Sequence, residues 1–143
     1  MNNLEVRSII VNQKSQNIML NKEQIATVEN AVLIGSTAWK KAFNSGDAGG
    51  CAAQYETTAV MNAKPFGTFT GSAAIQEFWQ KLIDDGFTDV EYLEPKIKVL
   101  NETSAILTSG WKMNKAQGLI HRELWVLQKD GTAKLRNDDF EAI

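Results

Sequence analysis

Cysteine, histidine and proline are scarce in this chain. Its 143 residues contain one cysteine, one histidine and two prolines. One cysteine excludes an intramolecular disulfide framework, and one cysteine with one histidine excludes a zinc site built from those residue types alone. We therefore expect no metal, and no motif in the sequence calls for a cofactor.

Charge of one sign and long apolar runs are also lacking. Fifteen Lys and Arg against seventeen Asp and Glu give a formal net charge of −2, whereas nucleic-acid-binding modules normally carry a basic surface. The apolar runs near the N-terminus, residues 9–11 and 18–20, are shorter than a signal-peptide core of about 7–15 residues or a membrane span of about 20. The expectation is a cytoplasmic protein with neither nucleic acid nor membrane as partner.

The remaining composition, 43% hydrophobic and 22% charged, is typical of a globular protein of one domain. Residues 1–21 are rich in Asn, Gln and Ser, and we interpret them as an extended arm with a strand near residues 4–11. The domain is expected over residues 22–143.

Helical periodicity begins at Lys22. Apolar residues at three- and four-residue spacing form one stripe of a helix that ends at residues 44–46, namely Ile25, Val28, Val32, Gly35, Trp39, Ala42 and Phe43. Gly46 suits the left-handed position after the helix, and Asp47 is expected to cap a short helix over residues 48–55. A third helix is predicted over residues 72–85.

The rest of the pattern predicts β-structure. Residues 57–62 read as a short strand and 64–67 as a loop, and longer strands are expected at 88–100, 103–114, 118–128 and 133–142. Pro95 predicts a bulge or an edge position, and Asp130 followed by Gly131 predicts a hairpin. Segregated helices and strands indicate an α+β fold with three N-terminal helices and a long antiparallel sheet. Such a sheet tends to coil, and helices laid across it can enclose a cone-shaped cavity.

The strand from residue 119 to residue 128 carries the candidate catalytic groups. Strict alternation places His121, Glu123 and Trp125 on one face, with Leu119 and Leu127. If that face is inward, desolvation raises the pKa of Glu123, and Glu123 with His121 could act as a general acid and base. Two alternatives remain open: both groups are structural, or the opposite face, with Ile120, Arg122, Leu124 and Val126, is the buried one.

Large apolar side chains supply a candidate binding site. Such residues can line a pocket for a small apolar or aromatic molecule, although the same residues can simply form the core. The candidates are Trp39, Tyr55, Met61, Phe66, Phe78, Trp79, Trp111 and Trp125.

Three other features carry no site. Cys51 lies among alanines and is expected to be a buried, inert thiol. The glycine-rich residues 46–50 lack the Lys-Ser/Thr ending and the preceding strand of a phosphate-binding loop. The carboxylate pairs at 84–85 and 138–139 have no metal-ligand spacing, and Asp138 and Asp139 alternate, so at most one faces a pocket.

Three segments, TAWKKAFNSGDAGGCAAQYETTAVM, GTFTGSAAIQEFWQKL and ELWVLQKDGTAKLRNDDFE, resemble the nuclear transport factor 2-like superfamily, and within it the SnoaL-like and ketosteroid-isomerase-like small bacterial proteins. The resemblance covers about residues 25–142. It implies a cone-shaped α+β barrel, ligands held in the cone, and a homodimer formed through the outer sheet face.

The catalytic pattern of that superfamily is only partly present. Trp39 stands where ketosteroid isomerases have a tyrosine, and Glu123 resembles their strand aspartic acid, a plausible neutral acid. Their base falls near Asn62 and Ala63, where this sequence has no carboxylate. The cavity Asp and His of SnoaL-like cyclases are loosely matched by Glu123 and His121.

These patterns leave three hypotheses. The favoured one is a dimeric protein that binds a small apolar or aromatic molecule in its cone. The second is an acid/base enzyme of isomerase, polyketide-cyclase or dehydratase type. The third is a homo-oligomeric association module, in which outer-face residues such as Arg122 and Leu124 matter more than the pocket.

Overall fold

A computed structural model describes residues 19–143 of the chain. The helices are α1 (Lys22–Asn44), α2 (Ala48–Ala52) and α3 (Ser72–Asp84). The strands are β1 (Tyr55–Lys64), β2 (Gly67–Thr70), β3 (Glu91–Asn101), β4 (Ser104–Lys112), β5 (Gln117–Leu127) and β6 (Ala133–Ala142). The strand expected near residues 4–11 lies outside the described residues.

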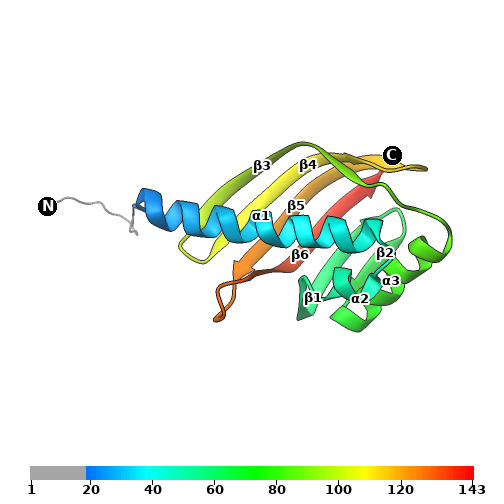
Figure 1. The fold of residues 1–143 in the computed structure, drawn as a ribbon, viewed down its shortest axis with the longest axis horizontal. Coiled ribbons are helices and arrows are strands. Elements are labelled where there is room, and N and C mark those ends of the chain that lie inside the picture. Colours follow the sequence, from blue (N-terminus) through cyan, green and yellow to red (C-terminus); the bar gives the residue numbers. More distant parts are fainter. Residues whose placement is uncertain (1–18) are drawn as a thin grey trace, which may run out of the picture.

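The six strands form one sheet in the order β2-β1-β6-β5-β4-β3. Neighbouring strands are antiparallel except β1 and β6, which are parallel. Figure 1 shows α1 crossing one face of the curved sheet, with α2 and α3 together at the end where β1 and β2 lie. The predicted α+β fold with three helices on a long, curved and mostly antiparallel sheet is therefore confirmed. The sequence missed two features, strand β2 and the parallel β1–β6 pairing.

Helix α1 begins and ends where the sequence predicted. The Asn21 side chain accepts a hydrogen bond from the Gln24 backbone N–H (2.8 Å), and the Gln24 side chain accepts one from the Asn21 backbone (3.0 Å), which forms a capping box. Past its end Gly46 has φ +78°, and the Asp47 side chain accepts from the Gly50 N–H at 2.9 Å to cap α2. These contacts fix the start of α1 and the turn that leads from α1 into α2.

The buried stripe of α1 follows the predicted spacing and packs on the sheet, with Ile25 only half-buried. Gly35 allows this close approach, because a Cβ atom there would lie 2.6 Å from the Trp125 ring. Trp125 is 1% exposed. The bulky indole therefore fills the space between α1 and β5.

Bulges interrupt four of the strands, β1, β3, β5 and β6. Strand β3 is an edge strand whose register shifts between Leu93 and Lys96, which confirms the expectation for Pro95. Strands β1 and β6 shift register together, between Tyr55 and Val60 on β1 and beside Arg136 on β6. Such irregularities increase strand twist and curvature.

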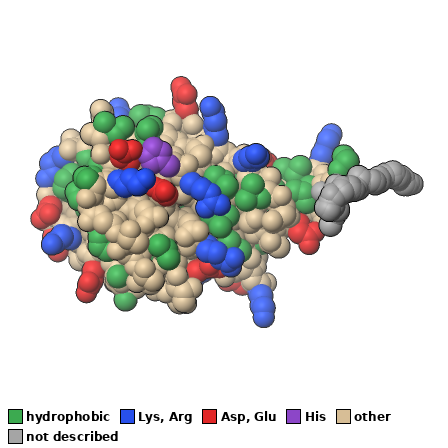
Figure 2. All heavy atoms as spheres, turned by 180° about the vertical axis from the view of Figure 1, so that it is seen from behind, with side chains coloured by type: hydrophobic (Ala, Val, Ile, Leu, Met, Phe, Trp, Pro, Cys, Tyr) green, Lys and Arg blue, Asp and Glu red, His purple; other side chains and the backbone are tan. Residues whose placement is uncertain are grey.

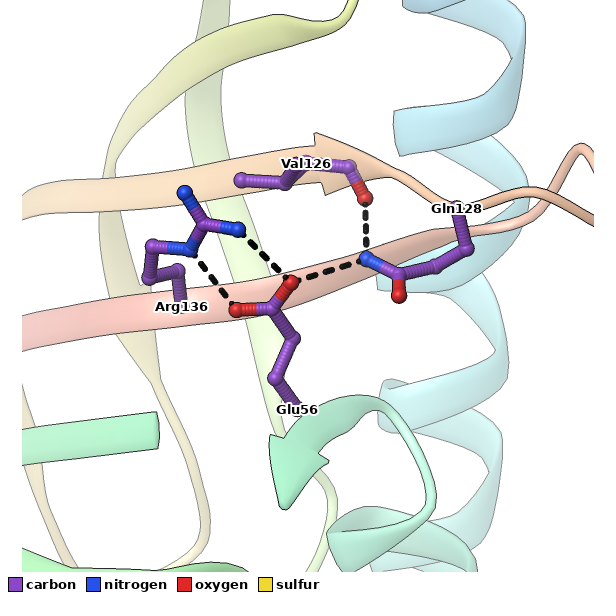
Figure 3. Close-up of polar contacts among 4 residues, drawn as sticks. All are labelled: Glu56, Val126, Gln128 and Arg136. Atoms are coloured by element: carbon purple, nitrogen blue, oxygen red, sulfur yellow. Dashed lines mark hydrogen bonds and ion pairs between the residues drawn. The ribbon is translucent and has the colours of Figure 1, made fainter. Parts of the chain in front are cut away.

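A polar clamp, formed by Glu56, Gln128 and Arg136, spans the irregular part of β1 and β6 (Figure 3). The Arg136 Nε and Nη2 groups donate to the two carboxylate oxygens of Glu56 at 2.8 and 3.1 Å, and Gln128 Nε2 donates to Glu56 Oε2 at 3.0 Å. The Arg136 guanidinium lowers the pKa of the Glu56 carboxyl. Glu56 therefore stays ionised and ties the β1 bulge to the sheet.

Candidate functional site

A cavity of about 280 Å³ lies between the inner face of the sheet and helices α1 and α3. Its volume is close to the lower end of the roughly 300–1,000 Å³ typical of ligand pockets. Aromatic and aliphatic side chains make up most of the lining. They are Trp39, Phe66, Phe78, Trp79, Leu82, Phe87, Val90, Tyr92, Trp111, Met113, Ala116, Ile120, Phe140 and Ala142, joined by Lys115, Glu123 and Asp138.

The aromatic wall is organised around Trp79 on α3. Trp39 and Phe78 each pack edge-on against it with ring centroids 4.9 Å apart, and Phe140 of β6 stacks on it at 5.6 Å with an interplanar angle of 20°. Trp111 of β4 extends the cluster through an edge contact with Phe140 at 6.3 Å. Interlocked rings of this kind give a rigid, preformed surface for a flat ligand.

One aromatic and one charged side chain lie at the rim of this wall. Phe66, between β1 and β2, is 56% exposed and contacts Phe78 at a centroid distance of 5.9 Å. Lys115 places its Nζ 4.7 Å from the centre of the Phe87 ring and donates to the Asp85 backbone carbonyl. The rim therefore joins the end of α3 to the β4–β5 connection.

Glu123 and Asp138 form a buried carboxyl pair in the cavity. They are direct cross-strand partners on β5 and β6, a position in which Cβ atoms lie about 4.5–5.5 Å apart. Their exposed fractions are only 7% and 3%. Two acids are thus held side by side in a largely apolar pocket.

Each carboxyl has a hydrogen-bond donor behind it. The Tyr55 hydroxyl donates to Asp138 Oδ2 at 2.6 Å, and Trp79 Nε1 donates to the Tyr55 hydroxyl at 3.3 Å. Trp125 Nε1 donates to Glu123 Oε1 at 2.9 Å. These donors fix the two carboxyl groups from the protein side and leave Asp138 Oδ1 with no hydrogen-bond partner among residues 19–143.

Burial and mutual repulsion favour the protonated forms of this pair. Desolvation, with a smaller contribution from the Asp139 charge, raises the pKa of Asp138 from 3.8 to about 7, against the opposing effect of the Tyr55 hydrogen bond. Desolvation and the neighbouring Asp138 charge raise the pKa of Glu123 well above its usual value. Close acids cannot both ionise easily, so near neutral pH the pair holds at least one proton.

Two indole N–H groups at the cavity also lack acceptors. Trp39 Nε1 and Trp111 Nε1 are buried and have no hydrogen-bond partner within the described part of the chain. A buried donor without an acceptor costs roughly 1–3 kcal/mol. The site therefore combines two acids, two free donors and aromatic walls.

His121 does not join Glu123, and the expectation that they share a face was wrong. The register of β5 shifts between Ile120 and Arg122 against β6 and between Ile120 and Glu123 against β4, so an extra residue reverses the side-chain alternation. Ile120 and Glu123 both point inward, whereas His121 and Arg122 are both exposed. His121 Nε2 lies 2.8 Å from Glu141 Oε1, on the side of the molecule away from α1, where the histidine is surrounded by charged side chains (Figure 2).

The predicted binding residues divide into two groups. Trp39, Phe66, Phe78, Trp79 and Trp111 line the cavity. The other three, Tyr55, Met61 and Trp125, are at most 2% exposed and lie outside that lining. Tyr55 and Trp125 instead support the carboxyl pair from behind.

Sequence reasoning missed Asp138 as a site residue. The alternation of Asp138 and Asp139 predicted only that at most one of them faces a pocket. Asp138 does point inward, and Asp139 is half-buried on the other side of the strand. The signal was its spacing of two from Phe140 on the same strand, which places both side chains on one face.

Residues 19–143 lack two features, a metal-binding cluster and a membrane-spanning helix. These residues contain no cluster of three or more His, Cys, Asp or Glu side chains that could hold a metal ion. Within the same part of the chain, no helix is long and apolar enough to cross a membrane.

Comparison with known proteins identifies the fold. No protein-family profile and no curated protein sequence matches the chain. A ketosteroid isomerase-like protein from Erwinia carotovora atroseptica superposes with a TM-score of 0.65 at 19% identity, over 86% of this chain and 98% of that one. An NTF-2-like protein of unknown function from Shewanella oneidensis gives 0.68 at 15% identity, over 79% and 98%.

A protein of unknown function with a cystatin-like fold from Nostoc punctiforme also gives 0.68, at 11% identity over 80% of this chain and 90% of that one. The chain therefore has the NTF-2-like, cystatin-like fold that the sequence resemblance implied. At these identities the likeness establishes the fold and not an activity.

Proposed function

We propose that this protein binds a compact, largely aromatic small molecule in its cavity, with a polar group of the ligand against Glu123 and Asp138. The observation that carries this proposal is the buried carboxyl pair, because its polar atoms converge on an otherwise apolar, preformed pocket. Pockets of this composition, with few and precisely placed polar groups, are typical of small-molecule sites.

A thermal-shift experiment with 2-naphthol tests the proposal. A ligand at about 100 times its Kd stabilises the folded state by roughly 2.7 kcal/mol, which raises the melting temperature measurably. Ala116→Trp fills the cavity from its lining and should abolish the shift. Ala26→Trp adds the same ring on the exposed side of α1 and should preserve it. An equal shift in both variants would contradict binding in the cavity.

The raised pKa values of Glu123 and Asp138 support a second candidate, an enzyme that moves a proton within its ligand. A general base works best when its pKa is near the working pH, and burial brings the pKa of Asp138 to about 7. In this mechanism Asp138 removes a proton from a carbon next to a carbonyl, protonated Glu123 donates a hydrogen bond to the oxygen that becomes negative, and Asp138 then returns the proton to carbon.

Deuterium exchange of 2-tetralone in D₂O, followed by NMR, tests this candidate without a known substrate. Asp138→Asn should slow the catalysed exchange by about 10²- to 10⁴-fold, the usual contribution of a general base. Asp139→Asn, which changes the neighbouring acid outside the cavity, should leave the rate unchanged. Exchange no faster than in buffer alone would remove this candidate while leaving ligand binding intact.

The homodimer through the outer sheet face stays a proposal. Arg122 is exposed on β5 and belongs to the face away from α1. Native mass spectrometry at micromolar concentration tests it: a monomer alone would exclude the association hypothesis, and a dimer lost in Arg122→Glu would favour it.

A further inference from the structure

The carboxyl pair lacks a cation. Among residues 19–143, no Lys, Arg or His side chain forms an ion pair with Glu123 or Asp138. Lys115, which lines the same cavity, is engaged at the rim by the Asp85 carbonyl and the Phe87 ring. Buried acids are normally paired with a positive group or kept neutral by a proton. The carboxyl pair has no positive partner among the described residues, so a bound cation could take the place of one of its protons.

The number of charges limits what that cation can be. Two adjacent carboxyls that share one proton carry a single negative charge. One positive charge brought into the cavity therefore gives a neutral site, whereas a dication leaves an excess charge. A donor on the ligand would also satisfy Asp138 Oδ1, the buried acceptor that has no partner within the described residues.

The walls also suit a cation. The faces of aromatic rings attract ammonium groups, and tryptophan does so more strongly than tyrosine or phenylalanine. The rings of Trp79, Phe140 and Trp111 form a continuous packed surface of the cavity. The free N–H groups of Trp39 and Trp111 require the opposite, an acceptor atom. A matching ligand has an ammonium group at one end and an oxygen elsewhere.

We propose that the cavity binds a small aromatic amine in its protonated, singly charged form, with the ammonium group donating to Asp138 Oδ1 and Glu123. A hydroxyl oxygen on the ligand ring accepts from one of the free indole N–H groups. This inference rests on the proposed small-molecule binding and specifies the class of ligand.

The pair makes binding of such an amine dependent on pH. Below the pKa of Asp138, about 7, both acids are protonated, so the amine must displace one proton to bind. The other titratable groups around the pair are Tyr55 on β1, Tyr92 on β3, Lys115 at the cavity rim and Asp139 on β6, whose charge adds to the raised pKa of Asp138. Burial raises the pKa of both tyrosines further above 10. Both tyrosines are thus neutral between pH 6 and 8, and we expect Asp138 to govern the dependence.

Tyramine and tyrosol provide the matched test, since they differ only in an ammonium group against a hydroxyl group. By isothermal titration calorimetry at pH 8, tyramine should bind at least ten times more tightly than tyrosol. Its Kd should rise about tenfold from pH 8 to pH 6, as expected for displacement of one proton from a group with a pKa of about 7. The Kd of tyrosol should change by less than twofold.

Variants test which residue is responsible. Asp138→Asn should reduce the preference for tyramine to less than twofold, and Asp139→Asn should preserve it. If Asp138→Asn does not fold, as judged by circular dichroism, Glu123→Gln provides the second variant and should reduce the preference at least fivefold. The wild-type pH series needs no variant at all.

The outcomes separate this inference from the proposed function. Equal binding of tyramine and tyrosol, or tighter tyramine binding at pH 6 than at pH 8, would overturn the amine inference and leave small-molecule binding in place. Failure of tyramine, tyrosol and 2-naphthol to bind would overturn both.

Discussion

The buried acid Asp138 should make the stability of the ligand-free protein decrease as pH rises. Its pKa is raised from 3.8 in the unfolded chain to about 7 in the folded protein, chiefly by desolvation. The folded state therefore binds the proton more tightly, and the resulting stabilisation is complete below pH 3.8 and is lost as pH rises through 7. For this group alone, the free energy of unfolding should fall by about 2–3 kcal/mol between pH 5 and pH 8.

Urea denaturation of the wild type and Asp138→Asn at these two pH values measures the effect. The asparagine has no ionisation, and its amide oxygen can still accept the hydrogen bond from Tyr55. We expect the variant to show less than half of the wild-type decrease and to be more stable than the wild type at pH 8. The remaining decrease belongs to Glu123, whose pKa burial also raises.

Asp139→Asn is the matched control, since it alters the next residue on the other side of the strand, where Asp139 Oδ1 lies 3.8 Å from Lys64 Nζ. This control should retain most of the decrease, because desolvation contributes more than the Asp139 charge to the raised pKa of Asp138. A wild-type free energy of unfolding that stays constant within about 0.5 kcal/mol from pH 5 to pH 8 would refute the reasoning, as would an undiminished decrease in Asp138→Asn.

Three further predictions concern packing, reactivity and the polar clamp. Gly118→Ala should lower the free energy of unfolding, measured in urea, by more than about 3 kcal/mol, because the new Cβ would lie 1.8 Å from a backbone oxygen. Gly49→Ala is the control: the nearest atom to its new Cβ is 3.5 Å away, so this variant should be neutral or stabilise the protein by up to about 1 kcal/mol. Burial raises the pKa of Cys51 to about 12, so iodoacetamide should label it at pH 8 roughly 1,000 times more slowly than in the urea-unfolded chain; equal rates would contradict its burial. A double-mutant cycle of Glu56→Gln and Arg136→Gln should give a coupling energy of about 0.5–1 kcal/mol that decreases in 1 M salt, and a salt-independent value would contradict an ionic origin.

Local chemistry explains why so much of the fold could be predicted. The ends of α1 depend on Asn21 and Gly46, and both residue types are specific for those positions. The long strands β3 to β6 were recognised because turn residues separate them. The parallel pairing of β1 with β6 could not be predicted, because no local pattern encodes which distant strands become neighbours.

The candidate site was predicted less well, for a reason that is visible in β5. Gly118 and Ile120 lie on the inner face of β5, and so do Glu123 and Trp125. The inward positions are therefore even-numbered before the bulge and odd-numbered after it. Alternation extended through the strand from Trp125 therefore placed His121 inward, whereas the bulge turns it outward. Both alternation patterns can be recognised in the sequence, but only the structure shows where the bulge changes one into the other.

The position of β6 has a consequence for the order in which the protein folds. This strand lies between β1 and β5, and the Tyr55–Asp138 hydrogen bond joins residues 83 positions apart in the chain. Contacts between distant residues slow folding because the intervening chain must be closed first. During synthesis β1 and β2 emerge long before β6, so their pairing edge and the aromatic residues of α3 remain uncovered until the last strand arrives. The cavity and its carboxyl pair therefore cannot form before β6 has been synthesised, and apolar surface left uncovered until then favours aggregation of the nascent chain.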